Sequence, residues 1–161
     1  VGKHNSCIRQ RFGMGGNMNR YLGIYRRCEL YYIREELEKY GLLSLEGRLL
    51  PLIKDKCMSQ EELGYMMNLD KGRIARAVSL LEEKGLVCRQ VNEKNRRQKL
   101  LSLSEAGVEM VKNIEEIYRK WDNICYTGFT AEEQALYQDF IKRMAENAAE
   151  YRRKNGGCLN G

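Results

Sequence analysis

Apolar residues recur every three or four positions along most of this chain, which is the spacing of amphipathic helices. The pattern predicts a helix over residues 18–39 that stops at Gly41, and a second helix from Ser44, its expected N-cap, to about residue 56. Pro51 lies inside this second helix and should kink or shorten it. Because the chain contains only this one proline, a mainly α-helical protein is expected.

Two short helices joined by a tight turn are predicted next. Ser59 and Glu62, three residues apart, are typical of a capping box, in which each side chain satisfies a backbone donor of the other residue. Asp70 stands where it can cap the following helix, which should end at Gly85. The inner apolar stripe of that helix is formed by Ile74, Val78 and Leu81.

A hairpin and two long helices complete the pattern. Residues 86–90 and 98–103 are β-compatible runs separated by a polar, charged segment, and they predict an antiparallel hairpin. Ser104 and Thr130 are expected to cap the last two helices. The apolar stripe of the first comprises Met110, Ile114, Ile117, Trp121 and Ile124, and that of the second Leu136, Phe140, Met144, Ala148 and Tyr151.

The positive charge is concentrated in two blocks. The net charge is +6, yet residues 28–69 and 100–161 are acidic on balance, whereas residues 70–99 hold nine basic and four acidic side chains. Residues 1–27 form the other basic block, of which 1–17 are expected to be a flexible tail. The block at 70–99 falls on the predicted second short helix and hairpin, which favours a shaped phosphate-binding surface.

This order of elements, a helix, a tight turn, a second helix and a basic hairpin, is typical of proteins that bind both grooves of double-stranded DNA. The second helix can enter the major groove while the hairpin tip reaches the adjacent minor groove. The candidate DNA-contacting residues are Lys71, Arg73, Arg76 and Ser79 on the helix and Lys94, Arg96, Arg97 and Lys99 on the hairpin. The alternatives are an ordinary solvated helix face and a solubilising turn.

Residues 59–107 resemble the winged helix-turn-helix of the MarR family of bacterial regulators. The likeness runs in order through the helix opening at 59–63, the recognition helix at 70–77 and the helix exit at 81–87. It continues with the wing tip at 95–97 and the return strand and next helix start at 101–107. The sequence departs from the family at Asn95, where family wings commonly carry an aspartate that orients an arginine.

The resemblance implies a winged helix-turn-helix at 44–103 and a helical dimerisation region at 18–43 and 104–154. Residues 155–161 lack apolar periodicity and are expected to be a flexible tail. The resemblance further implies a homodimer that binds a pseudo-palindromic operator in double-stranded DNA. The protein would act as a repressor, and a small aromatic effector would release it from the DNA. Half-sites should lie about one helical turn, or a multiple of it, apart.

Two features are candidates for sensing. Tyr25 and Tyr32 could line a ligand cleft, although a tyrosine stripe is more often core or dimer interface. Cys28 lies next to Arg26 and Arg27, whose charge favours a thiolate, so a redox-sensing regulator is an alternative. A free cysteine is more often a small buried apolar residue.

Other functional classes find little support in the sequence. No nucleophile with a base and no phosphate-binding glycine loop can be named, so we expect no catalytic residues and no enzyme. The six cysteines are scattered singly and the one histidine is His4, so neither a metal site nor a cofactor is expected. No run suits a membrane span, and a cytoplasmic protein is expected. A winged helix used only for protein contacts remains an alternative.

Overall fold

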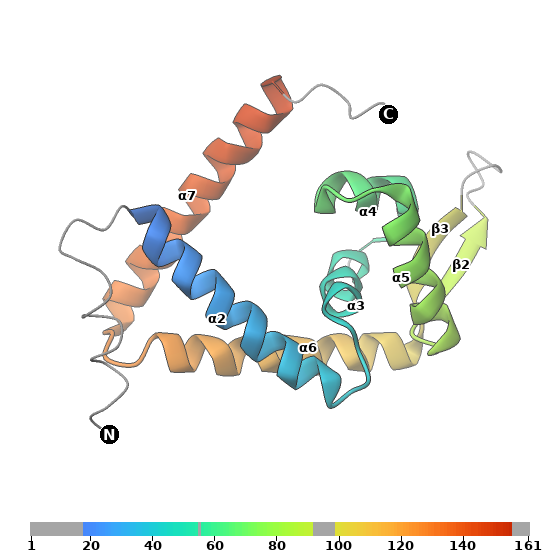
Figure 1. Cartoon of the computed structure of the whole chain (residues 1–161), viewed down its shortest axis with the longest axis horizontal. Coiled ribbons are helices and arrows are strands. Elements are labelled where there is room, and N and C mark those ends of the chain that lie inside the picture. Colours follow the sequence, from blue (N-terminus) through green and yellow to red (C-terminus); the bar gives the residue numbers. More distant parts are fainter. Residues whose placement is uncertain (1–17, 55, 92–98, 156–161) are drawn as a thin grey trace. The chain divides into compact units, whose positions relative to one another are not determined.

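The computed structural model describes residues 18–54, 56–91 and 99–155 (Figure 1). The expected tail at 1–17 lies outside the described residues, as does the tail at 155–161 apart from Asn155, which ends the last helix. The elements are α2 (Met18–Glu38), α3 (Ser44–Leu49), the 3₁₀ helix η1 (Leu50–Ile53), β1 (Met58–Ser59), α4 (Gln60–Met67), α5 (Lys71–Glu83), β2 (Val87–Val91), β3 (Lys99–Leu103), α6 (Glu105–Cys125) and α7 (Ala131–Asn155). The expected fold class, mainly α-helical with a small hairpin wing, is confirmed.

Helices α2 and α5 end in the same way. In each, a glycine in the left-handed conformation follows the helix, Gly41 with a φ of 66° and Gly85 with a φ of 69°. The amide of Leu42 donates to the Leu37 carbonyl (3.1 Å), and that of Leu86 donates to the Leu81 carbonyl (2.9 Å). These are Schellman motifs, which satisfy carbonyls of the last turn and stop the helix where glycine permits a positive φ.

The second predicted helix differs from expectation in two respects. Its N-cap is Leu43 and not Ser44, because the Glu46 carboxylate accepts a hydrogen bond from the Leu43 amide (2.7 Å) and closes the helix start one residue earlier. The α-helix ends at Leu49, and the chain continues as a 3₁₀ turn with Pro51 in its first turn. Proline is tolerated there because that position needs no amide donor.

The sheet has three antiparallel strands in the order β1-β3-β2. Val87 pairs with Leu103 and Val91 with Lys99, which makes the predicted hairpin. The sequence pattern did not reveal β1, whose two residues pair with β3 through Met58 opposite Leu101. Figure 1 shows the hairpin beside α5, and an ion pair between Arg89, in the middle of β2, and Glu82 of α5 joins the two (2.7 Å).

The chain divides into two compact units, Val1–Trp121 and Asp122–Gly161. In the first, the buried core draws on α2 to α6 and on the sheet, with the largest wholly buried apolar side chains being Leu37, Leu42, Leu49, Leu50, Met58, Leu63, Ile74, Leu81, Leu101 and Ile114. The second contains α7, which Thr130 caps through its hydroxyl and the Glu133 amide (3.2 Å). Tyr126 packs edge-on against Phe129 and Tyr137 in this unit.

Helix α7 carries an uncovered apolar stripe in the single chain. Its large apolar side chains Leu136, Phe140, Met144 and Tyr151 are all exposed. They recur at steps of four or seven residues and so share one side of the helix. An amphipathic helix normally buries such a stripe against another element.

Candidate nucleic-acid interface

Helix α5 separates its core side chains from its charged ones. Ile74, Ala77, Val78 and Leu81 are buried, and the 3.6-residue period places the intervening positions on the opposite side. Four of the candidate DNA-contacting residues, Lys71, Arg73, Arg76 and Ser79, are exposed there. Asp70 begins the helix by accepting a hydrogen bond from the Arg73 amide (2.9 Å), which occupies the Asp70 side chain with capping.

The exposed cations of α5 differ in their partners from several exposed cations of α6 and α7. Arg119 pairs with Glu116 on α6 (2.6 Å), and Arg143 pairs with Asp139 on α7 (3.0 Å). Within the described part of the chain, no ion pair involves Lys71, Arg73 or Arg76, and residues 71–81 contain no acidic side chain. The face of α5 therefore presents net positive charge to an external anion.

Helix α4 and the turn after it set the position of α5. Ser59 is buried and its hydroxyl accepts from the Glu62 amide (3.2 Å), while the Glu62 carboxylate accepts from the Ser59 amide (2.7 Å). These bonds from Ser59 lower the pKa of Glu62, because they favour its ionised form. Asn68 is the C-cap of α4, with a φ of 52°, and Asp70 is the N-cap of α5, so only Leu69 lies between the two cap residues.

The wing is only partly described. Lys99 is exposed at the first position of β3, opposite Val91. Lys94, Arg96 and Arg97, the other predicted wing contacts, lie outside the described residues, as does Asn95. The described part of the hairpin runs from the Val87–Leu103 pair to the Val91–Lys99 pair.

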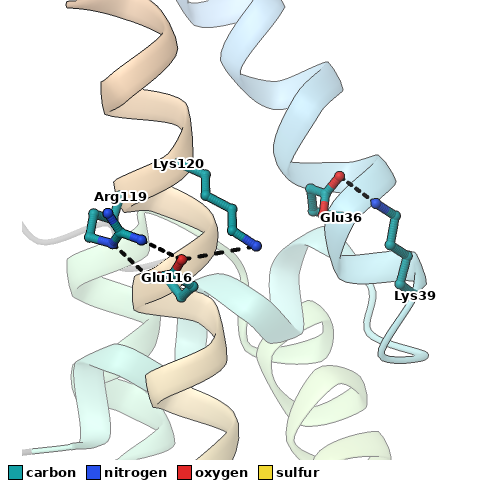
Figure 2. Close-up of polar contacts among 5 residues, drawn as sticks. All are labelled: Glu36, Lys39, Glu116, Arg119 and Lys120. Atoms are coloured by element: carbon teal, nitrogen blue, oxygen red, sulfur yellow. Dashed lines mark hydrogen bonds and ion pairs between the residues drawn. The ribbon is translucent and has the colours of Figure 1, made fainter.

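Tyr25 and Tyr32, the candidate cleft residues, both pack on Trp121 of α6. Their ring centroids lie 5.8 Å and 5.3 Å from that of the indole. Burial, followed by the negative charge of Glu36, raises the pKa of Tyr32. Figure 2 shows the ion pair of Glu36, on α2, with Lys39, which follows that helix, and those of Glu116 with Arg119 and Lys120 on α6.

Cys28, the candidate redox residue, is an exposed free thiol on α2. Its neighbour Arg26 forms an ion pair with Glu29, so part of the positive charge that the sequence places near the thiol is neutralised.

Ser104 caps α6, as expected. Its hydroxyl accepts a hydrogen bond from the Gly107 amide (3.0 Å) and donates one to the Gly85 carbonyl (2.6 Å).

Sequence reasoning did not single out Glu46, which is fully buried on α3 and paired with Lys84 (2.6 Å). The two residues are 38 positions apart, so no local pattern could indicate the pair. Glu46 also lines a pocket of about 250 Å³ beside the charged face of α5, together with Leu43, Leu45, Arg73, Arg76, Ala77 and Leu80.

The described residues contain no group of three or more histidine, cysteine, aspartate or glutamate side chains that could hold a metal ion. None of their helices combines the length and apolar character needed to cross a bilayer.

The fold is that of a winged helix-turn-helix protein. It has a capped helix, a tight turn, a second helix with its cations outward and a hairpin packed beside that helix.

Within the winged helix-turn-helix class, the chain is similar to known transcriptional regulators. Residues 49–99 match the MarR family model. The HTH-type transcriptional regulator BilQ of Clostridium symbiosum (strain WAL-14163) is 28% identical over 127 residues, which cover 78% of this chain and 88% of the relative. These similarities are consistent with a winged-helix transcriptional regulator of the MarR family.

Solved structures agree with this assignment. A crystal structure of MarR is 28% identical, with a TM-score of 0.81 over 89% of this chain and 98% of the other. A MarR transcriptional regulator from Methanosarcina mazei Go1 is 27% identical, with a TM-score of 0.77 over 83% and 97%. A Listeria monocytogenes chain assigned to the same family is 24% identical and shares the fold, with a TM-score of 0.76 over 91% and 99%.

Proposed function

We propose that this protein is a homodimeric, sequence-specific double-stranded DNA-binding regulator, a repressor, whose helix α5 reads the major groove. The observation that carries the proposal is the face of α5 formed by Lys71, Arg73 and Arg76, which are exposed opposite a buried stripe and have no acidic partner among the described residues. Exposed cations of this kind can bind DNA phosphates, which releases the counterions of the duplex, and they can donate hydrogen bonds to base edges.

Arginine is the side chain best suited to the reading step. Its planar guanidinium can donate two parallel hydrogen bonds to O6 and N7 of a guanine, and Arg73 and Arg76 are three residues apart on the same exposed side. Lys71, in the first turn, is placed to hold a phosphate near the helix N-terminus. The Listeria monocytogenes neighbour was crystallised with a 26mer DNA, which supports a duplex as the partner of this fold.

The wing completes the proposal. The strands that carry it are fixed beside α5 by the Arg89–Glu82 ion pair, so a hairpin tip can lie over the minor groove when α5 lies in the major groove. A wing arginine, Arg96 or Arg97, would enter the narrow groove, where the negative potential is enhanced. Lys94 and Lys99 would contact phosphates.

Dimerisation would supply the second half-site. The exposed stripe of Leu136, Phe140 and Met144 on α7 is the kind of surface that a second copy buries. A two-fold symmetric dimer then requires a pseudo-palindromic operator. Repression would follow from occupation of a promoter, and a small aromatic effector would release the protein if it favours a dimer geometry that cannot span both half-sites.

Fluorescence anisotropy tests the reading role of α5. The probe is a labelled duplex that the wild-type protein selects from a random-sequence pool, and the competitor is the same duplex with its sequence scrambled. Arg73→Ala and Arg76→Ala are expected to weaken binding to the selected duplex by about 1–3 kcal/mol each and to reduce discrimination against the scrambled one.

Arg119→Ala is the matched control, because it removes an exposed arginine from α6 that already pairs with Glu116 (2.6 Å). It should leave both affinities at the wild-type level. If Arg73→Ala and Arg76→Ala bound the selected duplex as tightly as Arg119→Ala, α5 would not be the reading helix, and the winged helix would instead be a scaffold for protein contacts.

A further inference from the structure

Lys84 joins the ends of two helices. It is the C-cap residue of α5, and its ammonium donates to the carbonyl of Gly41, which follows the C-terminus of α2 (2.8 Å). The same ammonium pairs with the Glu46 carboxylate of α3 (2.6 Å). One side chain therefore connects the recognition helix to the helix that precedes the DNA-binding lobe, and we call these three residues the Lys84 brace.

The electrostatics of the brace explain why a cation lies there. Helix C-termini carry partial negative charge, and the ammonium lies at the ends of α2 and α5 and beside a carboxylate. Glu46 is completely buried, while the Lys84 side chain is 33% exposed. Both helices end in Schellman motifs at this point, so the carbonyl of Gly41 is held in a fixed direction for the lysine.

The brace is a poor device for stability alone. Burying the Glu46 carboxylate costs desolvation energy that its attraction to Lys84 need not recover, and apolar replacements of buried pairs are frequently neutral or stabilising. Here the cost is increased because the second carboxylate oxygen of Glu46, Oε1, is buried without a hydrogen-bond partner in the described structure. What Lys84 and Glu46 do supply is a fixed orientation of α5 relative to α2, because these hydrogen bonds form only when the two helices are placed in this way.

The C-terminal end of α5 is also held by two hydrogen bonds from Ser104. The Ser104 amide donates to the Leu86 carbonyl (3.1 Å), and the Ser104 hydroxyl donates to the Gly85 carbonyl (2.6 Å). The C-terminal turn of α5 is thus tied to the start of α6 by Ser104 and to α2 and α3 by Lys84. One end of α5 is therefore held on two sides, by Ser104 and by Lys84.

We propose that Lys84 and Glu46 are positioning residues that set the angle of α5 relative to α2, and thereby the half-site spacing that the dimer recognises. This inference rests on the proposed function, since spacing has meaning only for a dimer on two half-sites. Neither residue needs to contact DNA. Their effect is on how far apart two copies of α5 lie, not on which bases one copy reads.

The test compares the operator selected by the wild-type protein with three relatives of it. These are a duplex whose half-sites are moved apart by about two base pairs, one whose half-sites are moved closer by as much, and one with a single half-site. The variant is the double substitution Glu46→Gln/Lys84→Met, which removes both charges but leaves an acceptor for the Leu43 amide. Lys84→Arg is the conservative variant, and Lys54→Met, which removes the Lys54–Glu115 pair (2.5 Å), is the control.

The wild-type protein, Lys84→Arg and Lys54→Met are expected to bind the selected spacing at least about tenfold more tightly than either shifted spacing. The double variant should bind all three spacings within about threefold of one another, while its affinity for the single half-site stays at the wild-type value. Its thermal midpoint should stay within about 4 °C of the wild-type midpoint, which excludes a general loss of structure.

A double variant that keeps the wild-type preference for one spacing would overturn the brace and leave the proposed function intact. A double variant that loses single half-site affinity together with thermal stability would also overturn it, because the brace would then only hold the fold together. A wild-type protein that selects no duplex, or binds every spacing equally, would instead contradict the proposed function on which the inference rests.

Discussion

The indole N–H of Trp121 donates a hydrogen bond to the hydroxyl of Tyr25 (3.1 Å), across the contact between α6 and α2. The Trp121 side chain is buried, with Tyr25 and Tyr32 packed on its ring. The pair therefore serves as a reporter for this contact, because Trp121 is the only tryptophan of the chain.

Tyr25→Phe should lower the free energy of unfolding by about 1 kcal/mol, because the indole N–H loses its acceptor while the aromatic contact is kept. Tyr32→Phe, which also keeps its ring on Trp121, should change it by less than about 0.5 kcal/mol. Urea unfolding followed by Trp121 fluorescence at one fixed protein concentration measures both. Equal losses in the two variants would show that the hydrogen bond contributes nothing.

Gly107 of α6 is predicted to tolerate no larger side chain. A Cβ at this position would lie 2.0 Å from the backbone carbonyl oxygen of Leu86, which cannot move without displacing the end of α5. Gly107→Ala should therefore cost about 3 kcal/mol, as severe overpacking does.

Gly23→Ala on α2 is the matched control, since its Cβ would meet only the end of Arg27 at 3.5 Å. This variant should stabilise the protein by about 0.5–1 kcal/mol through helix propensity. Thermal unfolding of the two variants distinguishes them. A Gly107→Ala protein as stable as Gly23→Ala would mean that α6 does not approach Leu86 so closely.

The capping box of α4 predicts a contribution to stability that depends on pH. Hydrogen bonds from Ser59 lower the pKa of Glu62 from its usual value near 4.5, so the folded state favours the carboxylate. The stabilisation is fully present above that usual value and is lost as the pH falls through the lower folded-state pKa. Glu62→Gln should remove this part of the acid dependence, measured as the urea midpoint between pH 7 and pH 3.

Glu61→Gln leaves both bonds to Ser59 in place and should keep the wild-type acid dependence. Ser59→Ala should cost about 1 kcal/mol at neutral pH, which is typical for loss of an N-cap. An unchanged acid dependence in Glu62→Gln would contradict the role of this carboxylate.

The apolar stripe of α7 predicts a dimer that a charge can disrupt. Phe140→Glu places a carboxylate in the middle of the exposed row of Leu136, Phe140 and Met144, and burial of an unpaired charge is costly. Light scattering at micromolar concentration should show a dimer for the wild-type chain and monomer for this variant. Gln138→Glu adds the same charge on the other side of the helix and should remain dimeric; a monomeric wild-type chain would exclude the stripe as a dimer interface.

Much of this fold could be predicted from the sequence because its signals are local. Capping boxes such as Ser59 with Glu62 place both partners within one turn, and the stripe of Ile74, Val78 and Leu81 fixes which side of α5 faces inward. The exposure of Arg73 and Arg76 follows directly from that stripe. Their base contacts do not follow, because recognition depends on a partner that the sequence does not contain.

The features that the sequence did not reveal depend on distant partners. Strand β1 is two residues long and exists because Met58 meets Leu101, more than forty positions away. Glu46 looks like any helical glutamate, and only the fold brings Lys84 to it. Pro51 indicated a disturbance in the second helix, but the choice of a 3₁₀ turn over a kink depends on how Leu50 and Ile53 are buried.

The most direct test of the central claim is the affinity of the wild-type protein for its selected duplex and for the scrambled duplex, measured across a salt series. We expect both affinities to fall steeply with salt, because binding releases counterions from the phosphates. The selected duplex should stay at least about a thousandfold tighter throughout. Equal affinities for the two duplexes at every salt concentration would contradict sequence-specific reading by this protein.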